Sequence, residues 1–199
     1  MRPINPRFDD SRGFTLLDML GTIAVMATLM AVAVPQLVNV IDNYRLGMAT
    51  REVERELQFA KLKAVSSDSP MRVRFNCPVA GQIRAVELIG TSAVPNANDA
   101  DNYTDRCKET LYPYKATGSD TSRLTKPNND GATRYLDSSV AITAFKTIEF
   151  WSDGTAHIDT GAGNPWPRAS TAGVTITLTR KGQTKNIVVN GLGKIQMDR

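Results

Sequence analysis

The stretch SRGFTLLDMLGTIAVMATLMAVAVPQL, residues 11–37, decides how the rest of this chain is interpreted. From residue 14 to residue 34 the only charged side chain is Asp18. A helix of that length rises about 31 Å, close to the thickness of the hydrocarbon core of a bilayer. The stretch therefore predicts a membrane-spanning helix that carries one carboxylate near its beginning.

A short polar leader, residues 1–13, precedes the apolar stretch. It holds Arg2, Arg7 and Arg12 against Asp9 and Asp10. Positively charged flanks tend to stay in the cytoplasm, so we expect the polar bulk of the chain on the opposite side of the membrane. A conventional cleaved signal peptide is the alternative. It is disfavoured because the small residues near position 33 run into a proline and then into more helix-like sequence.

Composition limits the remaining possibilities. A chain of 199 residues fits one domain, or one domain with an appendage. The formal net charge of +4 falls to +3 without the leader, which is too little to imply nucleic acid by itself. The content of 41% hydrophobic and 22% charged residues is ordinary, but the apolar residues are crowded near the front.

The segment RGFTLLDML resembles the processing signal of type IV prepilins and type II secretion pseudopilins. The resemblance implies cleavage between Gly13 and Phe14 by a prepilin peptidase, methylation of the new Phe14 amine and retention of the apolar helix. Asp18 stands where this family usually has glutamate. Pro35 falls where such subunits commonly carry a helix-kinking proline.

Asp18 needs a partner, because a carboxylate in lipid or in a packed helical bundle is costly unless it is paired. The resemblance implies that the partner is the Phe14 amine of the same chain or of a neighbouring subunit in a filament. The alternative is an acid that reaches the cytoplasmic interface, about one turn from the helix end, and contributes little.

Beyond Pro35 the pattern becomes amphipathic. Apolar residues recur every three or four positions: Leu46, Ala49, Val53, Leu57, Ala60 and Ala64. We predict a continuous helix of roughly fifty residues that ends at SSDSP, residues 66–70. Its filament-core part covers residues 14–35 and its amphipathic part residues 36–68, which should bury one stripe under a sheet.

Residues 69–199 have the patterns of strands and turns and predict a β-rich domain. MRVRF alternates, QIRAVELIG is a mixed apolar run, and TIEFWSDGTAHI is a strand, an Asp-Gly turn and a strand. VTITLTRKGQTKNIVVN is the clearest hairpin. Residues 91–137 are polar and predict a long surface loop with short strands inside it. The predicted fold class is α+β, with a long N-terminal helix packed on antiparallel sheet.

A second resemblance narrows the family. ATREVERELQFAKLKAVSSDSPMRVRF is similar to the junction of helix and first strand in H-type pseudopilins (GspH) and FimT/FimU minor pilins. IEFWSDGTA and NIVVNGLGKIQ resemble later motifs of that group. The likeness covers both ends of the chain and leaves the loop around Cys107 unmatched.

We predict no catalysis, no cofactor and no metal. The only histidine, His157, lies in a predicted strand without cysteine or a second histidine at metal spacing. Asp99, Asp101 and Asp105 have a faint cation-loop spacing but lack the glycine and terminal glutamate of a calcium loop. A solvated loop is the better interpretation.

The two cysteines, Cys77 and Cys107, both lie in the polar part of the chain. Outside the cytoplasm we expect a disulfide, which would hold a loop that lacks apolar anchors. Two free thiols are the alternative.

Basic residues crowd the last hairpin and tail: Arg180, Lys181, Lys185, Lys194 and Arg199. Such a cluster can contact phosphates without sequence preference. The resemblance to FimT-like pilins suggests DNA capture through a Gly-Arg-x-Arg motif. This chain has Gly193-Lys194-Ile195-Gln196, which keeps one basic position as lysine and lacks the other.

Two hypotheses follow. The first is a structural subunit, a minor pilin or pseudopilin of a type IV pilus or type II secretion system. It would be held in the bacterial inner membrane with its domain in the periplasm or outside the cell. Its partners would be the prepilin peptidase and other pilins. The second is a subunit of the same kind that binds DNA for uptake.

Overall fold

The computed structural model describes residues 14–114 and 129–198. One helix, α1, runs from Leu16 to Ser67 and passes through Pro35 without a break. The predicted long helix is therefore confirmed, and it ends at the expected place. After it, Asp68 has a left-handed backbone (φ 49°) and Pro70 leads into the first strand.

Internal contacts divide the chain into two units, Met1–Ile41 and Asp42–Arg199. In the first unit, every described side chain of residues 14–41 is exposed. This part of α1 is long and apolar enough to cross a membrane.

In the second unit, one stripe of α1 is buried beneath the sheets. The six predicted apolar positions all belong to it, and Leu46, Val53 and Leu57 are fully inaccessible. The stripe also contains three polar residues that the apolar periodicity did not indicate: Asp42, Thr50 and Glu56.

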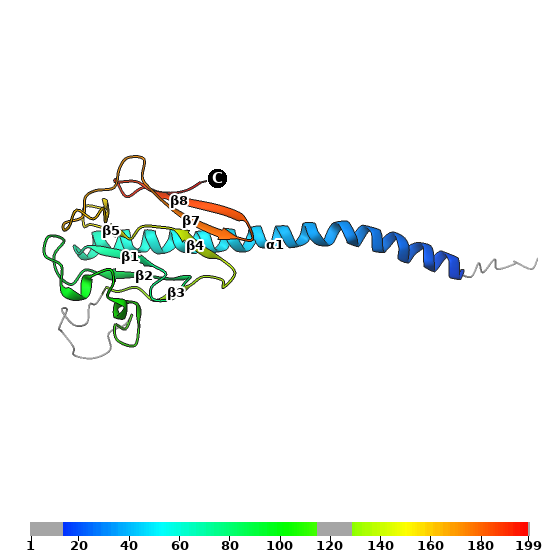
Figure 1. The fold of residues 1–199 in the computed structure, drawn as a ribbon, viewed down its shortest axis with the longest axis horizontal. Helices are drawn as coiled ribbons and strands as arrows, with labels where there is room; N and C mark the ends of the chain where they lie inside the picture. The colour runs from blue at the N-terminus through cyan, green and yellow to red at the C-terminus, as the bar shows by residue number, and fades with distance from the viewer. Residues whose placement is uncertain (1–13, 115–128, 199) are drawn as a thin grey trace, which may run out of the picture. The chain divides into compact units, whose positions relative to one another are not determined.

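The first sheet has five strands in the order β3-β2-β1-β5-β6, and its strand pairs are antiparallel. Its strands are β1 (Met71–Phe75), β2 (Gln82–Glu87), β3 (Arg134–Tyr135), β5 (Ile148–Phe150) and β6 (Ala156–Ile158). Figure 1 shows β1, β2 and β5 alongside the C-terminal part of α1.

The second sheet has four antiparallel strands in the order β4-β7-β8-β9. Its strands are β4 (Ala141–Ala144), β7 (Val174–Arg180), β8 (Gln183–Val189) and β9 (Ile195–Met197). Lys181 and Gly182 form the two-residue turn between β7 and β8, with φ of 45° and 80°. Positive φ at both positions is the geometry that tight hairpins favour. The predicted antiparallel sheets are confirmed.

A single apolar core joins the helix to the inner faces of both sheets. β1 contributes Met71 and Val73, β5 contributes Phe150, and the second sheet contributes Ile176 and Ile187, all fully inaccessible. Because the side chains of a strand alternate, the arginines of β1 point away from this core.

The outer face of the first sheet is covered by residues 88–112, here called the covering segment. It contains two short 3₁₀ helices, η1 (Ala97–Asp99) and η2 (Thr104–Cys107). We expected a surface loop, but Asp99, Arg106, Cys107 and Tyr112 in this segment are buried. The covering segment is therefore a second layer over the sheet, and charged side chains hold it there.

Candidate functional site

The N-terminus of α1 is closed by a reciprocal pair of side chains. Asp18 Oδ2 accepts hydrogen bonds from Thr15 N at 3.2 Å and from Thr15 Oγ1 at 2.7 Å. In return, Thr15 Oγ1 accepts from Asp18 N at 3.2 Å. This is a capping box, which satisfies backbone N–H groups that the first helical turn leaves unpaired. Sequence reasoning missed it, although the Thr-x-x-Asp spacing at the start of an apolar run was its signal.

Phe14 lies just outside that cap and its side chain is 78% exposed. Gly13, the other half of the predicted cleavage site, lies outside the described residues together with the rest of the leader. The start of α1 therefore joins Thr15 to Asp18, and Phe14 directly precedes this pair in the chain. Pro35 lies well inside α1 and is exposed.

At the beginning of the second unit, Asp42 binds two cations of the β7–β8 hairpin. Its Oδ1 accepts from Arg180 Nε at 3.0 Å and Nη2 at 2.8 Å. Its Oδ2 lies 2.9 Å from Lys181 Nζ. The hydrogen bonds from Lys181 and then Arg180 hold the pKa of Asp42 below its usual value. Ion pairs from Asp42 to Arg180 and Lys181 thus join the helix to the hairpin, and both of these cations are predicted DNA-binding residues.

The predicted basic cluster does not form one patch. Arg180 is only 5% exposed. Lys185 lies over Gly47 of α1, with its ammonium 3.5 Å from where a β-carbon would be. Lys194 is exposed and precedes β9, beside the end of β8 far from the Lys181 turn. Seven strand residues separate those ends by about 23 Å. Arg199 lies outside the described residues.

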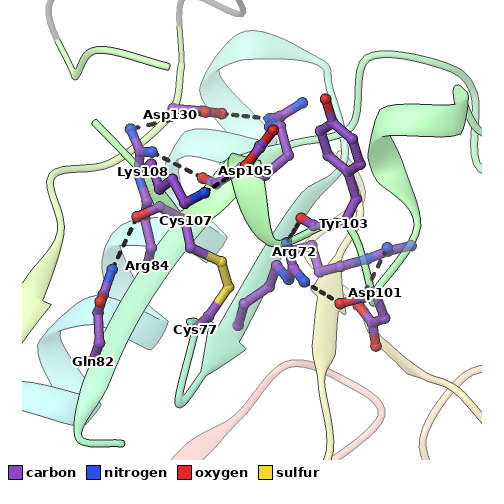
Figure 2. Close-up of a disulfide and its surroundings, with 12 residues drawn as sticks. Arg72, Cys77, Gln82, Arg84, Asp101, Tyr103, Asp105, Cys107, Lys108 and Asp130 are labelled. Carbon is purple, nitrogen blue, oxygen red and sulfur yellow. Dashed lines mark hydrogen bonds and ion pairs between the residues drawn. A yellow bond between two sulfur atoms is a disulfide. The ribbon is translucent and has the colours of Figure 1, made fainter. Parts of the chain in front are cut away.

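The structure joins Cys77 to Cys107, whose Cα atoms are 5.4 Å apart. This is the disulfide that the sequence predicts. It ties η2 to the chain just beyond β1, and Gln82 Nε2 supports it with a 2.9 Å hydrogen bond to the Cys107 carbonyl (Figure 2).

Three arginines of β1 and β2 line the outer face of the first sheet and donate to the covering segment. Arg74 donates to the carbonyls of Tyr103, at 2.8 Å, and of Asp101. Arg84 donates to the carbonyl of Arg106 at 2.8 Å and to that of Tyr112. Burial lowers the pKa of both guanidinium groups. Backbone carbonyls of an irregular segment thus supply the acceptors that these cations require.

Arg72, the third of these arginines, connects the sheet to two aromatic residues. It donates to Glu149 Oε2 at 3.2 Å, and its guanidinium lies 4.0 Å from the centre of the Trp166 ring. The Trp151 indole N–H donates to the other Glu149 oxygen at 2.9 Å. Arg72, Glu149 and Trp166 are buried and Trp151 is half-buried. Stacking of a guanidinium on an aromatic ring is a geometry that favours arginine.

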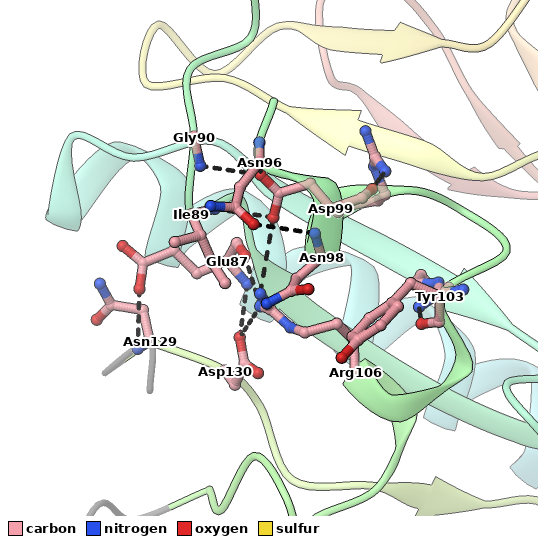
Figure 3. A network of polar contacts seen from close by, with 12 residues as sticks. Glu87, Ile89, Gly90, Asn96, Asn98, Asp99, Tyr103, Arg106, Asn129 and Asp130 are labelled. Carbon is pink, nitrogen blue, oxygen red and sulfur yellow. Dashed lines mark hydrogen bonds and ion pairs between the residues drawn. The ribbon is translucent and has the colours of Figure 1, made fainter. Parts of the chain in front are cut away.

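Asp99 and Arg106 of the covering segment form a buried network with Asp130 (Figure 3). Asp99 accepts from three backbone N–H groups, those of Ile89, Gly90 and Asn96, each at 2.9 Å. Arg106 Nη2 donates to Asp130 Oδ1 at 2.7 Å and to the Glu87 carbonyl at 2.6 Å. Asp130 also accepts from Glu87 N at 2.7 Å.

Two buried carboxyl groups, those of Asp130 and Glu56, have pKa values above the usual range. Burial raises the pKa of Asp130 to about 6, against the opposing effect of the Arg106 charge. Burial also raises the pKa of Glu56 on α1, which lies 3.5 Å from Arg134. Among the described residues Asp130 Oδ2 makes no hydrogen bond and lies 4.0 Å from Arg84 Nη2.

The aspartates with a faint cation-loop spacing are used in other ways. Asp101 lies 3.4 Å from Arg72 and Asp105 2.7 Å from Lys108, while Asp99 caps backbone N–H groups. In the parts of the chain that the structure describes, no group of three or more acidic, histidine or cysteine side chains is placed to hold a metal ion.

His157 is buried in β6 and has structural contacts. Its ring stacks on Trp151 with centroids 3.6 Å apart. Its Nδ1 lies 2.8 Å from the Trp166 carbonyl and its Nε2 2.9 Å from Thr155 Oγ1. These contacts fit the interpretation of His157 as a satisfied structural residue.

Comparison with known proteins gives three solved structures. The chain is similar to the type IV minor pilin FimU of Pseudomonas aeruginosa in two crystal forms, at 14% identity and TM-scores of 0.42 and 0.44. Those matches cover 77% and 79% of this chain and 92% and 90% of FimU. It is also similar to the minor pseudopilin EpsH of the Vibrio cholerae type 2 secretion system, at 10% identity and a TM-score of 0.43. That match covers 77% of this chain and 96% of EpsH.

No protein-family model and no curated protein matches the sequence.

Proposed function

We propose that this chain is a minor pilin or pseudopilin, a structural subunit of a type IV pilus or a type II secretion pseudopilus. A prepilin peptidase removes residues 1–13, the Phe14 amine is methylated, and α1 anchors the subunit in the bacterial inner membrane. The globular unit lies on the periplasmic or outer side. There it meets other pilins as the subunit enters a filament.

One observation carries this proposal: a single helix changes its surface along its length. Residues 14–41 expose apolar side chains on all sides, whereas one stripe of the remaining helix is buried under sheets. An exposed apolar helix of this length needs lipid or other helices around it. A subunit that moves from a membrane into a helical filament core meets both environments.

The start of the helix supports the processing step. α1 begins at Leu16 behind the Thr15–Asp18 cap, so Phe14 is outside the helix. After cleavage the Phe14 amine is a cation one residue away from that cap. We place it with the Asp18 carboxylate of its own or a neighbouring subunit, because a charge in this environment is stable only when paired.

Mass spectrometry of the mature N-terminus tests the proposal directly. The full chain is expressed with and without a prepilin peptidase. We expect the peptidase to yield a chain that begins at a methylated Phe14 and stays in the membrane after alkaline extraction. Gly13→Leu is the control, and it should leave the leader attached. A mature chain that begins at Met1, or after Pro35, would contradict the proposal.

We do not propose DNA capture. Its five candidate residues are divided between a buried ion pair, two ends of β8 and a position outside the described residues. A protein that tracks a nucleic acid backbone needs its cations on one continuous surface.

A further inference from the structure

Six charged groups gather where the β7–β8 hairpin turn meets α1 at the start of the second unit. We call this the basal face: Arg45, Arg180, Lys181 and Lys185, with Asp42 and Asp137. Arg180 Nη1 lies 3.4 Å and Arg45 Nη1 3.7 Å from Asp137. Four cations against two carboxylates leave two positive charges uncompensated.

The uncompensated charge is accessible. The Lys181 side chain is 62% exposed and that of Arg45 is 51% exposed. Lys185 has no carboxylate within ion-pair distance in the described part of the chain. Arg180 is buried and holds the hairpin in place. A ligand can therefore reach the exposed Lys181 and Arg45 and the half-buried Lys185.

Lys181 occupies its position at a conformational cost. Its φ of 45° lies in the left-handed region, where glycine or asparagine is favoured. Asp42 already receives two N–H groups from Arg180, so a second cation is not needed to neutralise it. A lysine at this position is explained if its exposed ammonium also binds a second anion besides Asp42.

The position of this face in the chain indicates what that partner is. The helix keeps exposed side chains, most of them apolar, as far as Ile41, and the face begins at the next residue, Asp42. Each headgroup layer is about 5–8 Å thick, since a bilayer measures about 40–45 Å and its hydrocarbon core about 30 Å. If residues 14–34 fill the hydrocarbon core, Asp42 lies eight residues, or about 12 Å, beyond it. The face then lies just outside the headgroup layer, where long arginine and lysine side chains can extend to the phosphates. This step rests on the membrane anchoring proposed above.

We propose that the basal face binds the phosphate groups of anionic phospholipids while the subunit is anchored in the membrane, before it enters a filament. Lys181, Lys185 and Arg45 donate N–H groups to the headgroup phosphates, and the Asp42–Arg180 pair holds the hairpin turn in position for this contact. Basic residues next to a membrane span attract anionic lipid in this way. Lys194, the exposed cation at the far end of β8, takes no part.

The test uses the full chain in neutral detergent micelles doped with equal amounts of phosphatidylglycerol and phosphatidylcholine, two headgroups that share the phosphate but differ in net charge. Native mass spectrometry measures the ratio of protein that retains each lipid. We expect a preference for phosphatidylglycerol in the unmodified chain. Removing three cations by Arg45→Gln, Lys181→Gln and Lys185→Gln should reduce that ratio about a hundredfold, about fivefold for each charge.

The matched control removes three cations that are exposed elsewhere on the second unit by Arg51→Gln, Arg55→Gln and Lys194→Gln, and it should keep the preference. Fluorescence of Trp151 and Trp166, both in the second unit, checks that each variant folds. No preference in the unmodified chain, or an equal loss in both triple variants, would overturn the proposal. The proposal would also be overturned if the basal triple variant lost binding to a duplex DNA oligonucleotide while it kept the lipid ratio of the unmodified chain. Failure of alkaline extraction to keep the chain in the membrane would instead overturn the proposed function.

Discussion

Asp18 has a structural role in the chain as well as the proposed assembly role. Its Oδ2 holds the Thr15 backbone and hydroxyl, so the carboxylate is already partly satisfied within its own helix turn. The other oxygen can accept from a second donor. An acid at the third helical position reaches back to the cap, a place that glutamate fills in the usual capping box and that aspartate fills here.

Replacing Asp18 separates processing from assembly. Asp18→Ala should leave leader removal unchanged, because the cleaved bond lies outside the helix, but should strongly reduce incorporation into filaments. Asp18→Glu, which keeps the charge, should retain incorporation. Immunoblots of whole cells and of sheared filament fractions measure both steps. Normal incorporation of the alanine variant would refute the pairing with the Phe14 amine.

Asp130 predicts an unusual pH dependence of stability. Its pKa is raised to about 6 in the folded unit, so ionising it disfavours the fold. Stability should be greatest below about pH 4 for this group and fall by up to about 3 kcal/mol as pH rises through 6. Glu56, whose pKa is also raised, adds in the same direction. Urea unfolding followed by tryptophan fluorescence between pH 4 and pH 7.5 measures the slope.

Asp130→Asn is the informative variant for this slope. The amide keeps an oxygen for Glu87 N and Arg106 but cannot ionise. We expect its stability to change much less between pH 4 and pH 7.5 than that of the unmodified chain. An unchanged slope would assign the dependence to other groups. Asp42 and Asp137, whose pKa values are lowered, lose their contribution only at more acidic pH.

At the scale of elements, periodicity predicts most of the structure. The apolar stripe of α1 and the hairpin of β7 and β8 follow from spacing alone. The buried polar layer does not, because MRVRF and QIRAVELIG indicate only which side chains share a face. Whether Arg72, Arg74 and Arg84 meet solvent depends on residues 88–112. The acceptors that bury them are largely backbone carbonyls, which leave no sequence signature.

The disulfide should contribute to the stability of the covering segment. Cys77 and Cys107 are separated by 30 residues. Closing a loop of that size stabilises a fold by about 3 to 4 kcal/mol in the chain-entropy model. The double variant Cys77→Ser, Cys107→Ser should therefore unfold at lower urea concentration, and its covering segment should become the first site of proteolysis. Equal protease resistance of both chains would mean that the arginine contacts alone hold the segment.

At the scale of the whole molecule, the second unit contains a complete core. The core residues all lie between Leu46 and Val189. A chain of residues 42–199 should therefore fold without detergent and show one cooperative thermal transition, measured by circular dichroism. A chain of residues 51–199 is the control. It loses Asp42 and the fully buried Leu46, and truncating one such leucine already costs about 2–5 kcal/mol. Equal stability of the two chains would show that this stretch of α1 does not hold the hairpin.

The arginine layer also determines how freely the outside of the protein can vary. Arginines of the first sheet hold residues 88–112 in place by donating hydrogen bonds to backbone carbonyls. These hydrogen bonds do not depend on which side chains the segment carries. Outward-facing residues such as Val94, which is 74% exposed, do not supply these carbonyls. New side chains can therefore be installed there without rebuilding the scaffold, much as an antibody changes its loops on a constant frame.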